Sequence, residues 1–106
     1  MKLLLDENLP KRLKQDFPEH EIFTVSDKGW QSKENGELLS LMISDDFDVF
    51  FTFDKNLKYQ QNFSKYPIPV FVLCASDNSY LTLSKLVSEI KIVLASKLIP
   101  GTSEIK

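Results

Sequence analysis

The sequence is poor in several residue types, and each scarcity excludes a class of fold or site. His20 is the only histidine, so a ribonuclease mechanism with two imidazoles is excluded and a histidine-rich zinc site is not expected. Cys74 is the only cysteine, so no disulfide framework can form, which agrees with a reducing cytoplasm. Three glycines and five prolines, beside 42 % apolar residues, predict a folded chain.

Long apolar runs and an excess of positive charge are also missing. No run approaches the roughly 18–20 apolar residues that a membrane span needs, and the two acids in "MKLLLDEN" argue against a signal peptide. The net charge of −2 argues against binding by bulk basicity, so RNA or DNA would need a local patch or a bound cation. The length of 106 residues predicts a single domain, which we place at residues 1–99. The segment "PGTSEIK" predicts a flexible tail at residues 100–106.

Segments with strand and helix character alternate along the chain. Strand character is found at residues 2–6, 20–26, 48–53 and 68–75. Helical character is found at residues 8–17, 36–45, 56–63 and 81–98. This order predicts an α/β fold, a three-layer α/β/α sandwich around a mainly parallel sheet of four strands. In the first helix Asn8 is a plausible cap, and in the second Leu38, Leu39, Met42 and Ile43 share one face.

Acidic side chains follow two of the predicted strands. Asp6 ends the first strand, Asp54 follows the third, and Glu37 lies in the first turn of the helix that leads into the third. Ligands of parallel α/β sheets bind at the carboxyl ends of the strands, so we expect these three acids to share a pocket. Carboxylates in one crevice repel each other unless a cation lies between them, and Mg²⁺ suits such a site and phosphate chemistry.

Each acid also has a structural explanation. The positive end of the helix dipole stabilises acids in a first turn, which would account for Glu7 and Glu37. Asp54 or Asn56 would be a good cap for the helix that follows. A metal site is favoured because the three acids occur together at positions where parallel sheets bind ligands.

Amides, one further acid and lysines surround these positions. We expect five of them to orient the carboxylates or bound waters: Glu7, Asn8, Asn35, Asn56 and Gln60. Three lysines are candidates for phosphate contacts: Lys33, Lys55 and Lys58. In a helix over residues 56–63 neighbouring residues project about 100° apart, so Gln60 is predicted to support the site and Gln61 to be structural.

Receiver domains of response regulators also place acids after the first and third strands. They require a lysine at the end of a later strand, and "FVLCASDN" supplies none. The chain also has fewer strand–helix units than that fold uses. The receiver interpretation is therefore disfavoured.

Five segments, in this order, resemble a prokaryotic PIN-like family related to PIN-domain nucleases and VapC-type toxins. They are "LLDENLP", "GW", "KENGELL", "DVFFTFDKNLKYQQN" and "IPVFVL", within residues 2–75. The resemblance implies a sandwich that binds Mg²⁺ or Mn²⁺ through acids and cleaves RNA. Asp6, Glu37 and Asp54 would be the metal ligands and catalytic residues, whereas Asn35 and Asn56 stand where relatives often have acids.

Two functions follow from this resemblance. The first is a cytoplasmic, metal-dependent endoribonuclease, with the toxin role of a toxin–antitoxin pair as an extension; its partners would be RNA, an antitoxin protein and a second copy of the chain, and not a membrane. The second is a catalytically weak PIN-like module that binds RNA or a protein partner. Asn35, Asn56 and the acidic pI of about 5.3 favour the second function.

Overall fold

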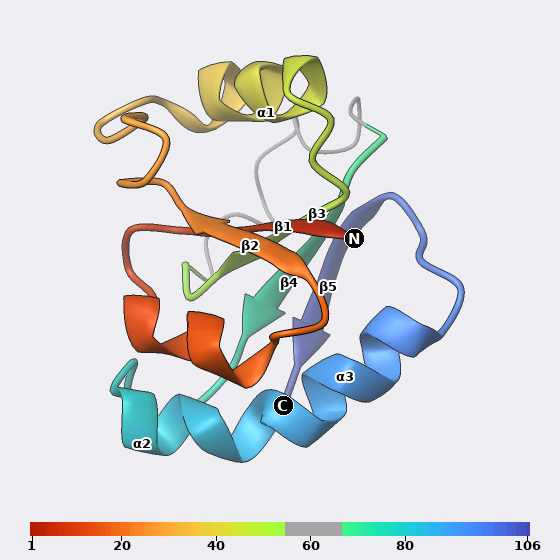
Figure 1. The fold of residues 1–106 in the computed structure, drawn as a ribbon. Helices are drawn as coiled ribbons and strands as arrows, with labels where there is room; N and C mark the ends of the chain where they lie inside the picture. Colours follow the sequence, from red (N-terminus) through yellow and green to blue (C-terminus); the bar gives the residue numbers. More distant parts are fainter. Residues whose placement is uncertain (55–66) are drawn as a thin grey trace.

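The computed structural model describes residues 1–54 and 67–106, and these form a parallel sheet between two layers of helices (Figure 1). The strands in these residues are β1 (Lys2–Leu5), β2 (Glu21–Thr24), β3 (Val49–Thr52), β4 (Pro69–Leu73) and β5 (Gly101–Ile105). The helices there are the 3₁₀ helix η1 (Lys11–Asp16), α1 (Asn35–Ser44), α2 (Tyr80–Leu83), the 3₁₀ turn η4 (Ser84–Leu86) and α3 (Val87–Ala95). The α/β class and the parallel sheet are confirmed.

The sheet has the strand order β2-β1-β3-β4-β5, and every pair is parallel. The expectation of four strands and a flexible tail at residues 100–106 is corrected, because Gly101–Ile105 form the fifth strand. β5 pairs with β4 from Gly101 opposite Pro69 to Ile105 opposite Leu73, and Ile105 is buried.

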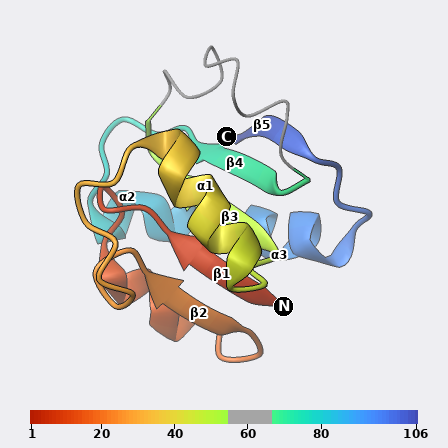
Figure 2. The same cartoon turned by 90° about the horizontal axis from the view of Figure 1, so that it is seen from above.

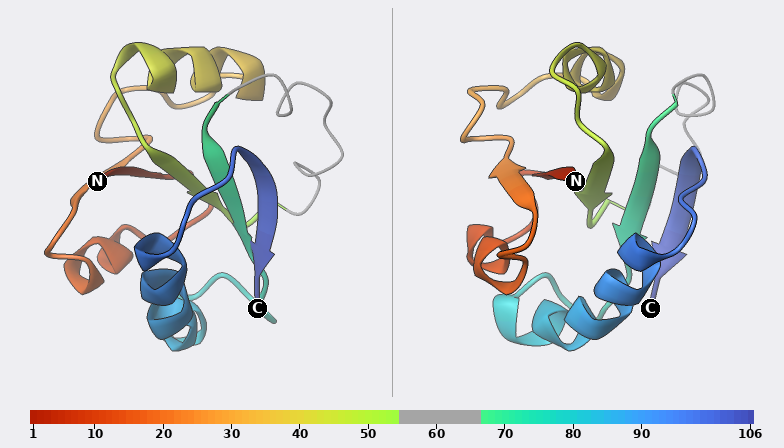
Figure 3. Two further views of the ribbon diagram at one scale, coloured as in Figure 1. Left: turned by 90° about the vertical axis from the view of Figure 1, so that its right-hand side faces the viewer. Right: turned by 45° about the vertical axis from the view of Figure 1, so that its right-hand side comes forward.

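Successive strand residues supply two separate cores, one on each face of the sheet. Leu3, Leu5 and Phe51 point to the layer formed by η1, α2 and α3, whereas Leu4 and Phe50 point to α1. This alternation follows from the two-residue repeat of a strand. Figures 2 and 3 show α1 crossing one face while η1, α2 and α3 cover the other. The apolar run of β3 at residues 49–51 is therefore explained by burial on both faces.

Three local expectations differ from the structure. Asn8 does not cap a helix: Pro10 holds the N-cap position of η1, and the Asn8 side chain binds elsewhere. Ile43 is 38 % exposed, because the buried stripe of α1 consists of Leu38, Leu39 and Met42. The helix expected at 81–98 is divided into α2, η4 and α3, which keep its apolar stripe against the sheet.

Candidate active site

The site begins with the pairing of the two strands that carry acids at their ends. β1 and β3 are neighbours, with Leu5 opposite Phe51, and the Asp6 amide donates to the Phe51 carbonyl at 2.9 Å. Asp6 follows β1 directly, and Asp54 follows β3 after one intervening residue. The two acids therefore lie together at the carboxyl ends of neighbouring strands, as expected for a parallel sheet. Their negative charges interact.

Thr52, the last residue of β3, connects the two acids. Its hydroxyl donates to Asp6 Oδ2 at 2.6 Å and accepts a hydrogen bond from the Asp54 amide at 3.1 Å. Thr52 is fully buried, whereas Asp6 and Asp54 are partly exposed, so the hydroxyl itself is shielded from water. Thr52 thus fixes the Asp6 carboxylate against the backbone of Asp54.

Replacing the Thr52 hydroxyl by a methyl group is expected to destabilise the fold. Thr52→Val keeps the shape but leaves Asp6 Oδ2 and the Asp54 amide without this partner, a loss of about 1–3 kcal/mol in unfolding free energy. Urea denaturation followed by circular dichroism measures it. Ser40→Ala, which removes an exposed hydroxyl on α1, is the control and should change stability by no more than about 0.5 kcal/mol. Equal losses in both variants would contradict the connecting role of Thr52.

Burial is the main influence on the charge of Asp6 and raises the pKa of its carboxyl group. The hydrogen bonds from Thr52 and from the Glu7 amide lower this pKa, while the negative charges of Glu7 and Asp54 raise it. The net direction is upward. A carboxylate held in this way, beside a second acid, is stabilised in its ionised form by a nearby cation.

Glu7 and Asn8 make structural contacts next to the acid pair. Glu7 Oε1 accepts a hydrogen bond from the Ser32 amide at 2.8 Å, which ties the loop before α1 to the end of β1. Asn8 Oδ1 accepts from the Phe53 amide at 3.1 Å. Both residues act on backbone groups, so they support the site through the loops that carry it.

Glu37, the third predicted ligand, has a different neighbour. It lies in the first turn of α1, as expected, and pairs at 3.3 Å with Lys33, which lies in the loop before that helix. Its side chain is 56 % exposed. Within residues 1–54 and 67–106 no three His, Cys, Asp or Glu side chains are grouped closely enough to hold a metal ion. A shared pocket for Asp6, Glu37 and Asp54 stays a prediction.

Several predicted site residues lie outside the described part of the chain. They are Lys55, Asn56, Lys58 and Gln60, together with Gln61 and the helix expected at 56–63. The side chain of Asn35, the first residue of α1, is likewise not described. The predictions for these residues stay as they were made.

Two contributors were not singled out by the sequence analysis. A polar Thr52 at the end of an apolar strand, two residues before an acid, is a signal that could have identified the first. Asn78, in the loop between β4 and α2, donates from Nδ2 to the Asn8 carbonyl at 2.8 Å. Nothing in the local sequence around Asn78 indicates this contact, because the two residues are 70 positions apart.

The donor set is suited to a hard cation with a small number of protein ligands. Asp6 and Asp54 offer carboxylate oxygens, and Mg²⁺ commonly takes one or two carboxylates and keeps several waters. Burial raises the pKa of Asp6, and a bound cation would favour its ionised form. Two carboxylates at the ends of neighbouring strands are the ligand type that Mg²⁺ or Mn²⁺ takes, and a bound ion stays a prediction.

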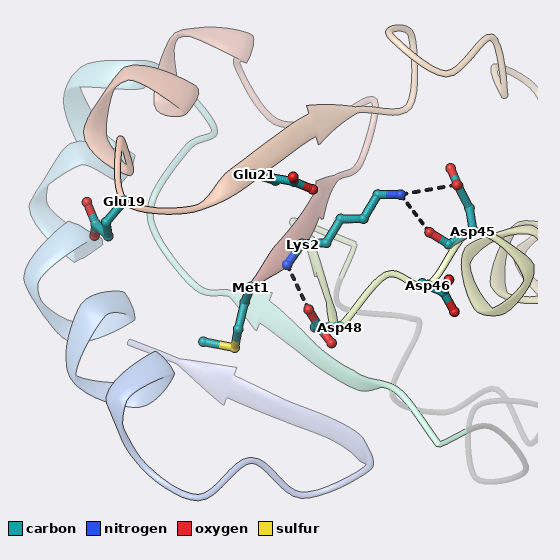
Figure 4. Close-up of a pocket in the computed structure, with 7 residues that line it drawn as sticks. All are labelled: Met1, Lys2, Glu19, Glu21, Asp45, Asp46 and Asp48. Carbon is teal, nitrogen blue, oxygen red and sulfur yellow. Dashed lines mark hydrogen bonds and ion pairs between the residues drawn. The ribbon is translucent and has the colours of Figure 1, made fainter.

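A pocket of about 570 Å³ lies at the opposite edge of the sheet, where the strands begin (Figure 4). Acids predominate in its lining, which consists of Met1, Lys2, Glu19, Glu21, Asp45, Asp46 and Asp48. Lys2 bonds Asp45 through its ammonium group and Asp48 through its backbone amide. A surface of this charge repels phosphate groups, so it is a poor place for a nucleic acid.

Comparison with protein-family models, with curated proteins and with solved structures finds no match. No helix in the part of the chain that the structure describes is long and apolar enough to span a membrane.

Proposed function

We propose that the protein is a metal-dependent endoribonuclease with a PIN-like site at the carboxyl ends of β1 and β3. The observation that carries the proposal is the Asp6–Thr52–Asp54 arrangement, in which a buried hydroxyl holds one carboxylate against the backbone of the other acid. The proposal also takes up the family resemblance of these segments, including the toxin role and the antitoxin partner that the resemblance implies.

The chain's own residues have simple tasks in this proposal. Asp6 and Asp54 would hold Mg²⁺ or Mn²⁺, which supplies a more acidic water and a contact to a phosphoryl oxygen when it is bound. Thr52 keeps the Asp6 carboxylate in one orientation. Hydrolysis by activated water needs no covalent intermediate, so the site requires no nucleophilic side chain.

Asp54→Asn is expected to abolish Mn²⁺ binding and the metal-dependent cleavage of a labelled single-stranded RNA. The variant removes one of the two charged ligands, and with it half of the negative charge that attracts a divalent cation. Calorimetry and gel analysis measure the two effects. Asp46→Asn is the control: Asp46 lines the pocket at the other edge, and its positive φ of 60° suits asparagine. Cleavage that persists unchanged in Asp54→Asn would sink the assignment.

The second candidate is a catalytically weak PIN-like module that binds RNA or a protein partner. The exposed Glu37 favours this second function, because its carboxylate pairs with Lys33. Among the described residues it belongs to no group of three side chains that could hold a metal ion. The same calorimetric titration separates the two functions. Saturable Mn²⁺ binding by the wild-type protein supports the nuclease, and its absence supports the binding module.

A further inference from the structure

Three segments that follow different strands are joined by two amide side chains. Asn78, after β4, donates from Nδ2 to the carbonyl of Asn8, after β1, at 2.8 Å. Asn8 Oδ1 accepts in turn from the amide of Phe53, after β3, at 3.1 Å. The three segments leave the same edge of the sheet, because all three strands are parallel. We call this chain of contacts the asparagine relay.

The relay replaces a bond that the sheet itself does not make. In a regular parallel ladder the Asp6 amide would bond the Phe51 carbonyl, and the Phe53 amide would bond the Asp6 carbonyl. The first bond is present at 2.9 Å, but the Asp6 carbonyl accepts from the Leu9 amide at 3.0 Å as the chain turns. The side-chain oxygen of Asn8 takes over as the acceptor for Phe53. The ladder is thereby extended one step beyond the end of β1.

This extra step acts on the residue next to Asp54. The Phe53 amide is held by Asn8 and the Asp54 amide by the Thr52 hydroxyl, so two consecutive backbone groups are fixed. Two fixed amides restrict the turn from which the Asp54 side chain departs. Asn78 adds to this restriction by holding the backbone of Asn8, and so the direction of its side chain.

We infer that Asn78, acting through Asn8 and the Phe53 amide, is a positioning residue that sets the place of Asp54 relative to Asp6. The inference rests on the proposed function for its effect on metal binding, but the relay itself is a property of the fold. Asn8 and Asn78 touch neither carboxylate in the contacts described here; they act on the backbone that carries one of them.

Asn8→Ala and Asn78→Ala test the relay with two independent readouts. The first is Mn²⁺ affinity by calorimetry, which is expected to fall about tenfold in each variant, the low end for residues that orient metal ligands. The second is hydrogen exchange of the Phe53 amide by NMR in metal-free protein, which should become faster in both variants. Asn78 is exposed, so its truncation leaves the core intact.

Ser79→Ala is the matched control. Ser79 caps α2, accepting from the Thr82 amide at 3.3 Å, and is the immediate neighbour of Asn78. Loss of the cap should lower the melting temperature by about 4–8 °C. Because Ser79 has no part in the relay, its Mn²⁺ affinity and its Phe53 exchange rate should match those of the wild type.

The outcomes separate the inference from the proposed function. If the wild type binds Mn²⁺ and Asn78→Ala binds it equally well with unchanged Phe53 exchange, the inference is overturned and the nuclease proposal stands. If the wild type binds no Mn²⁺, the nuclease proposal fails. The Phe53 exchange rate then still decides the relay: faster exchange in Asn78→Ala supports it, and an unchanged rate overturns it.

Discussion

Asp6→Asn is expected to raise the melting temperature of the metal-free protein at pH 7 and to remove the stabilisation that Mn²⁺ gives the wild type. Burial raises the pKa of Asp6 in the folded protein, so folding opposes its ionisation. Asparagine keeps one oxygen to accept from the Glu7 amide, and its NH2 group can donate to the Thr52 hydroxyl oxygen, so both contacts persist without the charge. In a chelator, Asp6→Asn should therefore melt at a higher temperature than the wild type. When Mn²⁺ is added, its melting temperature should rise less than that of the wild type.

The pH dependence of this effect follows from the direction of the shift. Below the ordinary aspartate pKa of 3.8, Asp6 is protonated in both states and contributes no difference. As the pH rises, the unfolded chain releases its proton first, so the folded state loses stability until the pH exceeds the raised pKa. The advantage of Asp6→Asn should accordingly be absent near pH 3 and grow as the pH rises from 3.8 through the raised pKa. Thermal melts across this range in EDTA measure it.

Asp77→Asn provides a control of opposite sign. The Ser79 side chain and amide lower the pKa of Asp77, so its charge stabilises the folded state above pH 3.8. Removing that charge should lower the melting temperature at pH 7. When Mn²⁺ is present at one hundred times its dissociation constant, binding should stabilise the folded wild-type protein by about 2.7 kcal/mol. Asp77→Asn should keep this stabilisation. A destabilised Asp6→Asn at pH 7 would contradict the argument.

Phe51→Ala is expected to remove a large part of the stability of the domain. Phe51 is 2 % exposed in β3, the central strand of the sheet, and its ring stacks on Phe71 with centroids 5.7 Å apart. Truncating a buried phenylalanine costs about 3–5 kcal/mol, while domains of this size have about 5–15 kcal/mol in total. Urea denaturation should show a much lower midpoint with an unchanged slope.

Ile92→Ala is the control for this change. Ile92 lies on α3 with 62 % of its surface exposed, so its truncation should change stability by no more than about 0.5 kcal/mol. Similar losses in the two variants would show that the core on the η1, α2 and α3 side contributes less than the packing indicates.

The strands that could be predicted from the sequence are the ones whose residues are almost all apolar. β1, β3 and β4 are apolar almost throughout, because helices cover both faces. β5 carries the sequence "GTSEI", in which Ile105 is its only buried residue. Its strand conformation comes from pairing with β4, and context of this kind outweighs strand propensity.

The site could be predicted as far as single strands determine it. Asp6 and Asp54 follow neighbouring parallel strands, so topology alone brings them to one edge. Glu37 lies in the first turn of α1, which follows a long loop from β2. Its position depends on the path of that loop, which includes the hydrogen bond from the Ser32 amide to Glu7. Asn78 depends on contacts 70 residues apart, which no local pattern encodes.

The strand order has a consequence for synthesis on the ribosome. β2 can pair with β1 as soon as both have emerged, and β3 then adds to the free side of β1. β4 extends the sheet beyond β3, and β5 extends it beyond β4. Each strand thus joins an edge that is already exposed, and none has to insert between two partners. Nascent chains are able to assemble this sheet in the order in which they are translated, without separating any pair already formed.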